Sequence, residues 1–372
     1  MAKNINELPF TEIVERASQL ARERSDVSNK VRGIVNDIYI REIARKEDWS
    51  FLLASSTITV RREYNTGTIV TANTGATTVT FSTDVALDAT YTGYKLKISG
   101  NPYVYDFTYE SATSGTIQPP ISGDTNAGGN TYSLVLPNYS LPTDFDRFPK
   151  NGGLVDFTGT TDKIIPESAY QDFLSDYRSS PTNIAERCRI IGLDTAGNSI
   201  LEINPPPKIA KSYRTDYFLR PRPMRETTAG VINSISASGT TVTGSAGTTR
   251  FSEATTGDYF RVDAFGKAGD SEWYRIIAIA NNSSLTLQTA FGLSGATSAN
   301  YTICSAPQMP VRLHPAILYG TILQLSADQD DPMIQGYIQK YAEVLSDGKR
   351  LYKTRIYNQD IHHLGEEWLY RR

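Results

Sequence analysis

The stretch Gly93-Tyr94-Lys95-Leu96-Lys97-Ile98 returns later in the chain as Gly257-Asp258-Tyr259-Phe260-Arg261-Val262. Four further runs return in the same order and at nearly the same spacing. They are Thr78–Thr80 with Thr241–Thr243, Val104–Phe107 with Trp273–Ile276, Thr116–Gln118 with Thr286–Gln288, and Thr131–Leu134 with Asn300–Ile303. Five matched strands predict two copies of one small β-barrel or β-sandwich module, residues 66–137 and 228–305, with an extra loop near 264–270 in the second copy.

The segment between the two modules, residues 138–227, also has the pattern of strands. The runs Arg189–Ile191, Ile200–Ile203 and Tyr213–Leu219 are rich in β-branched and aromatic residues. The turn residues Asp194–Asn198 predict a hairpin between the first two runs. A short helix is expected within 168–177, so we predict a central β segment with one helix.

The two ends of the chain have a helical pattern instead. Apolar residues recur at the spacing of one helix face in four stretches, from which we expect four amphipathic helices. The faces of these helices are lined by Phe10, Ile13, Val14, Ala17, Leu20 and Ala21; Val31, Ile34, Val35 and Ile38; Ile317, Leu318, Thr321, Ile322 and Leu325; and Ile334, Tyr337, Ile338, Tyr341, Val344 and Leu345. The predicted fold class is therefore α+β, with residues 1–55 and 307–355 in one helical bundle, a mostly β middle and a C-terminal tail, 356–372.

Composition excludes several classes of protein. The net charge is −3, whereas proteins that grip nucleic-acid phosphates usually carry a basic surplus. The two cysteines, Cys188 and Cys304, are too few for a disulfide framework and suggest synthesis in a reducing cytosol. The N-terminal residues have no apolar core of a signal peptide, and no apolar run is long enough to span a membrane. We therefore expect no membrane association.

Motifs that carry catalytic chemistry are absent from the sequence. There is no phosphate-binding loop, no dinucleotide fingerprint and no nucleophile elbow, since Gly292–Gly295 is one residue too short. His363 and Glu367 could share a helix face, but no third metal ligand is near them. Asp328, Asp330 and Asp331 are followed by a proline and fit helix capping better than calcium binding. The sequence predicts no enzyme activity, no metal and no cofactor.

Basic residues form two modest clusters. Arg220, Arg222 and Arg225 lie within Leu219–Glu226, and Lys349, Arg350, Lys353 and Arg355 lie in the last expected helix. A solvated face balanced by acids explains either cluster. Contact with phosphate groups or with an acidic patch of a partner is the alternative, and both alternatives stay open.

Several segments carry a resemblance to a known family. They are Val35–Tyr39 ending in Trp49–Leu52, then Tyr139–Arg147, then Leu201–Pro207 followed by Tyr213–Pro221. Together with the helical ends they cover about half the chain, and they resemble the head-to-tail adaptor (connector, tail tubular protein A-like) family of tailed bacteriophages. The two repeated modules depart from the compact pattern of that family and are similar to decoration domains of phage structural proteins.

The resemblance implies a structural virion protein of the neck or tail, assembled in the host cytoplasm. Such a protein forms a homo-oligomeric ring, expected to be dodecameric, that docks on the portal protein and extends the DNA channel. It supports tail tube or nozzle proteins, and packaged DNA passes through its lumen without sequence-specific binding. A ring requires a heterologous interface, in which one patch contacts a different patch on the next copy.

The C-terminal tail is the expected portal-docking segment. An exposed aromatic cluster at a terminus is costly unless a partner or the protein's own core covers it. Tryptophan, tyrosine and arginine also dominate interface hot spots. The candidate docking residues are Arg355, His362, His363, Trp368, Leu369, Tyr370, Arg371 and Arg372. Folding back onto the chain's own helices is the alternative.

A second function class also remains open. Repeated β-modules rich in glycine, threonine and aromatic residues occur in phage tail or fibre proteins and in other adhesive proteins that bind host glycans. That function would require exposed aromatic platforms on the modules, on which sugar rings can stack.

Overall fold

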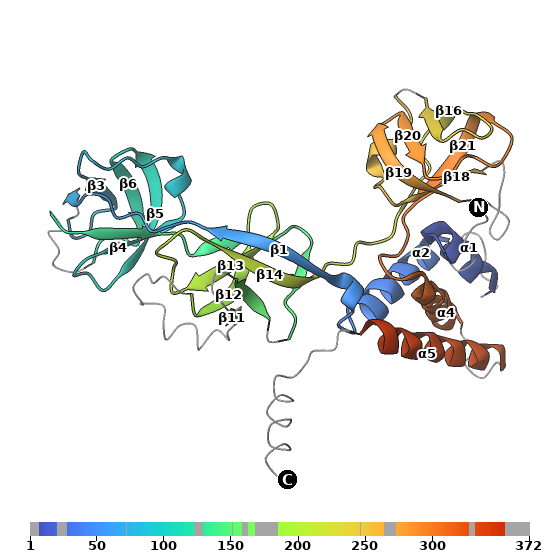
Figure 1. The fold of residues 1–372 in the computed structure, drawn as a ribbon, viewed down its shortest axis with the longest axis horizontal. Helices are drawn as coiled ribbons and strands as arrows, with labels where there is room; N and C mark the ends of the chain where they lie inside the picture. The colour runs from blue at the N-terminus through green and yellow to red at the C-terminus, as the bar shows by residue number, and fades with distance from the viewer. Residues whose placement is uncertain are drawn as a thin grey trace, which may run out of the picture. The chain divides into compact units, whose positions relative to one another are not determined.

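The computed structural model describes residues 7–20, 28–71, 73–122, 129–150, 152–157, 163–167, 185–245, 247–263, 273–326 and 332–353. The chain divides into two compact units (Figure 1). One unit combines Met1–Leu52 with Pro221–Arg372, and the other is Leu53–Arg220. Among the described residues, no helix is long and apolar enough to cross a membrane.

The first repeated module is a small barrel of six strands. Its strands are β2 (Ile69–Thr71), β3 (Thr78–Phe81), β4 (Tyr94–Ile98), β5 (Val104–Ser111), β6 (Ser114–Gln118) and β7 (Tyr132–Val135), paired in the order β2-β3-β6-β5-β4-β7. Backbone bonds from Gly129 to Ile69 and from Ile69 to Asn130 join the two ends of this order. Closure removes the exposed sheet edges that otherwise invite aggregation.

The second module has the same strand order. Its strands are β16 (Val231–Ile235), β17 (Thr241–Gly244), β18 (Tyr259–Val262), β19 (Tyr274–Asn281), β20 (Ser284–Leu287) and β21 (Ala296–Cys304), and the short β15 (Glu226–Thr227) pairs with the end of β21. The long strand β21 pairs with both β16 and β18, which closes the barrel. The pairing β16-β17-β20-β19-β18-β21 therefore repeats the order of the first module strand for strand.

Each barrel is held by two tyrosine hydroxyls at matched positions. In the first barrel, Tyr132 donates to the carbonyl oxygen of Thr66, and in the second, Tyr301 donates to that of Ala229. The hydroxyl of Tyr105 accepts the backbone N–H of Ser122, as that of Tyr274 accepts the N–H of Gly292. The rings of all four tyrosines are buried in the two barrel cores. The two copies thus share internal polar bonds as well as strand order.

The rest of the Leu53–Arg220 unit consists of two further sheets. One contains β1 (Leu53–Val60), β14 (Lys211–Leu219), β10 (Gly153–Asp156), β11 (Lys163–Pro166) and β9 (Phe145–Arg147), and the other contains β12 (Arg187–Leu193), β13 (Ser199–Asn204) and β8 (Asn138–Ser140). The hairpin expected at Asp194–Asn198 joins β12 to β13, and the Asp194 carboxylate accepts the N–H groups of Ala196 and Asn198. The helix expected within 168–177 lies outside the described residues.

The helices belong to the other unit. They are α1 (Phe10–Leu20), α2 (Ser28–Asp37) continued by a π-helical segment (Ile38–Ala44), α4 (His314–Leu325) and α5 (Pro332–Tyr352). Short 3-10 turns occur at Ser50–Leu52, Ala89–Tyr91, Phe251–Glu253 and Val311–Leu313. Helix α4 is close to its neighbours because Gly320 has no side chain, and a Cβ atom there would lie 2.8 Å from Ile38.

The predicted α+β class with one bundle of N- and C-terminal helices is wrong. The described chain is mostly β, with twenty-one strands in four sheets against four α-helices. The helices do not form a separate adaptor-type bundle, because they share one compact unit with the second barrel. An apolar stripe shows only that one face of a helix is buried, and cannot tell whether a helix or a sheet covers it. Helix α1 contacts α2 and α4, and the backbone N–H of its first residue, Phe10, also donates to the carbonyl of Ser305, directly after β21.

The predicted domain boundaries stay predictions where the described residues do not reach them. The extra loop near 264–270 and the tail 356–372 lie outside the described part of the chain. The first module, 66–137, and the central β segment, 138–227, lie within one compact unit up to Arg220. The range 228–305 forms one compact unit together with the helical residues.

We predict that Tyr132→Phe destabilises the first barrel by about 1 kcal/mol, because the variant loses the part-buried hydrogen bond from the Tyr132 hydroxyl to the carbonyl of Thr66. Thermal unfolding of the full chain measures the change. The control is Tyr103→Phe in the same barrel, where the ring is 47% exposed and the change should stay below about 0.5 kcal/mol. Equal stability of the two variants would contradict the assigned role of the hydroxyl.

Candidate functional site: the ion-pair seam and the arginine cleft

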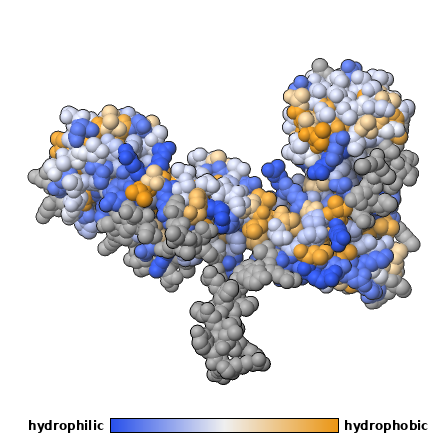
Figure 2. Space-filling view, viewed as in Figure 1, coloured by the Kyte–Doolittle hydropathy of each residue, from blue (hydrophilic) through white to orange (hydrophobic). Residues whose placement is uncertain are grey.

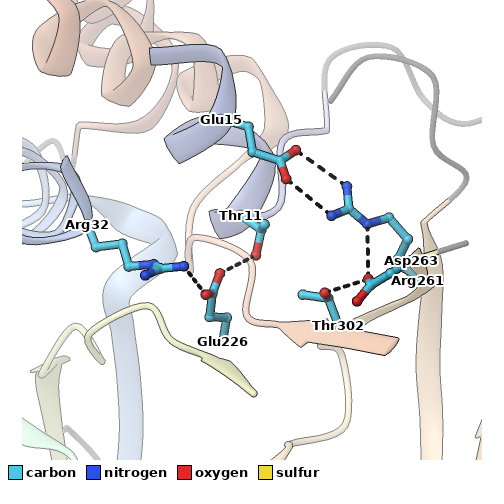
Figure 3. A network of polar contacts seen from close by, with 7 residues as sticks. All are labelled: Thr11, Glu15, Arg32, Glu226, Arg261, Asp263 and Thr302. Atoms are coloured by element: carbon cyan, nitrogen blue, oxygen red, sulfur yellow. Dashed lines mark hydrogen bonds and ion pairs between the residues drawn. The ribbon is translucent and has the colours of Figure 1, made fainter. Parts of the chain in front are cut away.

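A seam of polar contacts joins the helices to the second barrel (Figure 3). Glu226, on β15, accepts a hydrogen bond of 2.9 Å from the hydroxyl of Thr11 in α1 and is also ion-paired with Arg32 in α2. The backbone N–H of Phe10 donates to the carbonyl of Ser305, directly after β21. One carboxylate of the barrel thus contacts two helices of the N-terminal segment.

Arg261 is the buried charge of the seam. It lies on β18, and its side chain is only 7% exposed. Its guanidinium pairs with Glu15 of α1 at 3.2 Å and with Asp263 at 3.8 Å, and it lies 4.6 Å from the ring centroid of Trp273. The hydroxyl of Thr302 donates to Asp263 at 2.7 Å. Because a buried charge is costly without partners, Glu15 and therefore α1 are held against the barrel.

His314 joins the start of α4 to the segment before α1. Its Nδ1 accepts the backbone N–H of Leu8 at 3.1 Å, and its Nε2 lies 3.2 Å from the carbonyl of Met309. This pair of contacts fits a neutral ring with the proton on Nε2. Burial lowers the pKa of His314 from 6.5, against the opposing effects of the Met309 carbonyl and of Glu7.

The segment Pro221–Arg225 runs beside the seam and is fixed by bonds on both sides. Asn36 of α2 accepts the N–H of Met224 at 2.7 Å and donates to its carbonyl at 3.0 Å. The N–H of Arg222 donates to Gln308 at 3.2 Å, and the N–H of Arg225 donates to the Ser305 hydroxyl at 2.7 Å. The backbone of this segment therefore has defined positions for its two arginines.

These arginines line a cleft of about 650 Å³. The lining residues come from three places: the Pro221–Arg225 segment, the turn before β18 with Arg275 on the neighbouring β19, and the residues that follow β21. They are Arg222, Pro223, Arg225, Thr255, Thr256, Gly257, Asp258, Arg275, Ser305, Ala306, Pro307 and Gln308. The three arginine side chains are exposed, whereas Asp258 is buried and accepts the N–H of Thr255 at 2.8 Å. The exposed charged groups on the cleft surface are therefore the three guanidinium groups.

The two cysteines are poor candidates for nucleophiles. Both are buried without a disulfide bond, and burial raises the pKa of each thiol to about 12. Thiolates are the reactive form, so neither side chain is activated at neutral pH. Within the described ranges, no group of three or more His, Cys, Asp and Glu side chains could hold a metal ion.

The portal-docking residues expected from the sequence, Arg355 to Arg372, lie outside the described residues, and so do Asp328, Asp330 and Asp331. Of the basic clusters, Arg222 and Arg225 do lie together in the cleft. The sequence analysis missed Arg275, which is distant in sequence and carries no motif. Alignment of the two modules could have singled it out, because Arg275 occupies the position of Asp106 in the first copy.

Comparison with known proteins does not assign this chain to a family. No protein-family model matches this chain, and no curated protein matches it. A solved structure of the phage phi92 endosialidase shares 14% identity with a TM-score of 0.18, covering 68% of this chain and 30% of its own length. The elongation factor SelB of Methanococcus maripaludis shares 9% identity with a TM-score of 0.15, covering 71% of this chain and 64% of its own. Scores this low establish no common fold.

We predict that Arg261→Met destabilises the unit of helices and second barrel by about 2 kcal/mol, less than for a fully buried pair because both acid partners are about one-third exposed. Chemical unfolding of the full chain measures this loss. As a control, Arg250→Met removes a surface pair with Glu253 and should cost below about 0.5 kcal/mol. Similar losses in the two variants would show that Arg261 does not hold the seam.

The buried His314 predicts a pH dependence of stability. The folded state lowers the pKa of this ring, so the unfolded chain binds more protons once the pH falls below about 6.5. The contribution of the neutral ring is therefore complete above that pH and is lost as the pH falls. Between pH 7.5 and 5.5 we expect the wild-type unfolding free energy to fall more steeply than that of His314→Gln. If the unfolding free energies of the two proteins change in parallel with pH, His314 does not cause the pH dependence.

Proposed function

We propose that this protein is a structural subunit of a tailed-phage particle and that its two barrels are binding modules. The observation that carries the proposal is the repetition of one barrel within the chain. Each copy has its own hydrophobic core, its own closure and its own matched tyrosine bonds. Two binding modules in one subunit, multiplied over several subunits, give strong attachment even when each contact is weak.

The phage assignment is supported by the segments that resemble adaptor proteins. Tyr139–Arg147 contains most of β8 and all of β9, Leu201–Pro207 includes most of β13, and Tyr213–Pro221 contains most of β14. Side chains from all three segments pack into one core, which includes Tyr139, Phe145 and Tyr217. The resemblance therefore concerns a coherent part of the fold.

The first placement is in the tail or a fibre, where the barrels would bind host glycans. The mostly β architecture with two like barrels favours it. Figure 2 shows hydrophobic residues scattered among polar ones on the barrel surfaces. Within the described residues of the barrels, Tyr103 is the one exposed large aromatic side chain, beside the exposed Val70 and Ile277. Stacking on aromatic platforms would thus be limited, and polar contacts would have to supply most of the recognition.

The second placement is the head-to-tail adaptor ring below the portal, with tail tube or nozzle proteins beneath it. It rests on the sequence resemblance alone, since the helices do not form the bundle expected of an adaptor. In this placement Arg355–Arg372 would dock on the portal. The absence of enzyme activity likewise remains a prediction.

Immunogold electron microscopy of purified particles tests the proposal, using antibodies raised against the full chain. Label at the distal tail or on fibres is expected for the first placement, and label at the neck for the second. Both placements would be refuted if particles of a phage that carries the gene bind no antibody and mass spectrometry finds no trace of the chain in them. An antibody against the major capsid protein serves as the positive control.

A further inference from the structure

The barrel fold does not require an arginine at position 275. Arg275 pairs in register with Tyr259, and at the matched place in the first barrel Asp106 faces Lys95. The same strand position thus carries an arginine in one copy and an acid in the other. Arg222 and Arg225 come from a separate segment and bring two further guanidinium groups to the same cleft. Three guanidinium groups gathered in one cleft, one of them at a strand position that does not require it, point to a ligand.

Among the described residues, the acids near the cleft form no ion pair with its three arginines. Asp258 is 6% exposed and accepts the N–H of Thr255. Arg225 donates to the backbone carbonyl of Glu253, which is neutral. Among the described residues, no carboxylate forms an ion pair with Arg222, Arg225 or Arg275. The cleft therefore presents charge-assisted donors for oxyanions, to which guanidinium groups bind in a bidentate manner.

We propose that this cleft binds an acidic glycan, with Arg222, Arg225 and Arg275 holding the carboxylate or phosphate groups of its sugars. The inference rests on the proposed function, since it names the kind of glycan that the second barrel recognises. It also explains how a barrel with no exposed large aromatic side chain among its described residues can bind sugar.

The lining favours a glycan over a protein or nucleic-acid partner. Protein interfaces are anchored by large apolar or aromatic side chains. The residues that line this cleft include no such side chain, and its apolar members are two prolines and one alanine. Thr255, Thr256 and Gln308 add hydroxyl and amide groups between the charges, which suits a ligand dense in hydroxyls. Nucleic acid would require a basic surplus, but the chain carries a net charge of −3. A volume of about 650 Å³ fits a short oligosaccharide.

Calorimetric titration of the full chain with tetragalacturonate tests the proposal. Its fully methyl-esterified form has the same sugars without charge and serves as the matched ligand control. We expect binding of the acid and none of the ester. Arg222→Gln and Arg275→Gln should each weaken binding roughly tenfold, because each removes a charge-assisted contact. A phosphorylated mannose trisaccharide, titrated in parallel, distinguishes phosphate from carboxylate as the preferred group.

The matched control variant is Arg41→Gln, which removes an exposed arginine paired with Asp37 outside the cleft and should leave affinity unchanged. Circular dichroism and thermal unfolding check that all three variants fold as the wild type does. Binding of neither acidic glycan overturns the proposal. So does equal or tighter binding of a tetraglutamate peptide or a short single-stranded DNA, or an equal loss of affinity in Arg41→Gln. If the antibody labels phage tails but the chain binds no acidic glycan, this inference alone is overturned. If the chain binds the glycan but is missing from the particles, only the proposed function is overturned.

Discussion

The buried guanidinium of Arg261 is the constraint on which the unit of helices and second barrel depends. A charge that is 7% exposed must be paired, and its partners come from the barrel itself and from α1. Glu15 can reach it only when α1 lies against β18, and in that position Thr11 can reach Glu226. Glu226 follows directly after the segment that carries Arg222 and Arg225. The seam therefore fixes both the helix and the arginines of the cleft.

The two barrels have matched interior residues and differ on their outer faces. Matched tyrosines and matched apolar residues preserve the interior, so the outer residues are free to differ. On β4 of the first barrel the outward residues are Lys95 and Lys97, and the matched residues on β18 are Tyr259 and Arg261. In the second barrel, Tyr259 donates to Glu7 and Arg261 pairs with Glu15. One barrel face has thus become a binding face for the chain's own N-terminal segment.

Sequence patterns predicted parts of this structure and missed others for physical reasons. The repeat, the hairpin at Asp194–Asn198 and the apolar stripes of the helices are local or periodic signals, and their residues do lie in barrels, in a hairpin and in helices. The predicted α+β class was wrong because a stripe does not identify its partner, and α1 packs partly on a barrel. The cleft brings together Arg222 and Arg275 from distant segments, and only strand register places them. The expected docking residues of the tail lie outside the described chain.

Hydrogen exchange measured by mass spectrometry on the full chain tests most directly whether the seam joins the helices to the barrel. If Arg261 holds α1 against the second barrel, the amides of Phe10–Leu20 and of Ala296–Cys304 should exchange with similar opening free energies in the wild type. In Arg261→Met, exchange in Phe10–Leu20 should accelerate at least tenfold while the central strands of the barrel stay protected. Unchanged protection of that helix in the variant, or a helix that already exchanges freely in the wild type, would contradict the account.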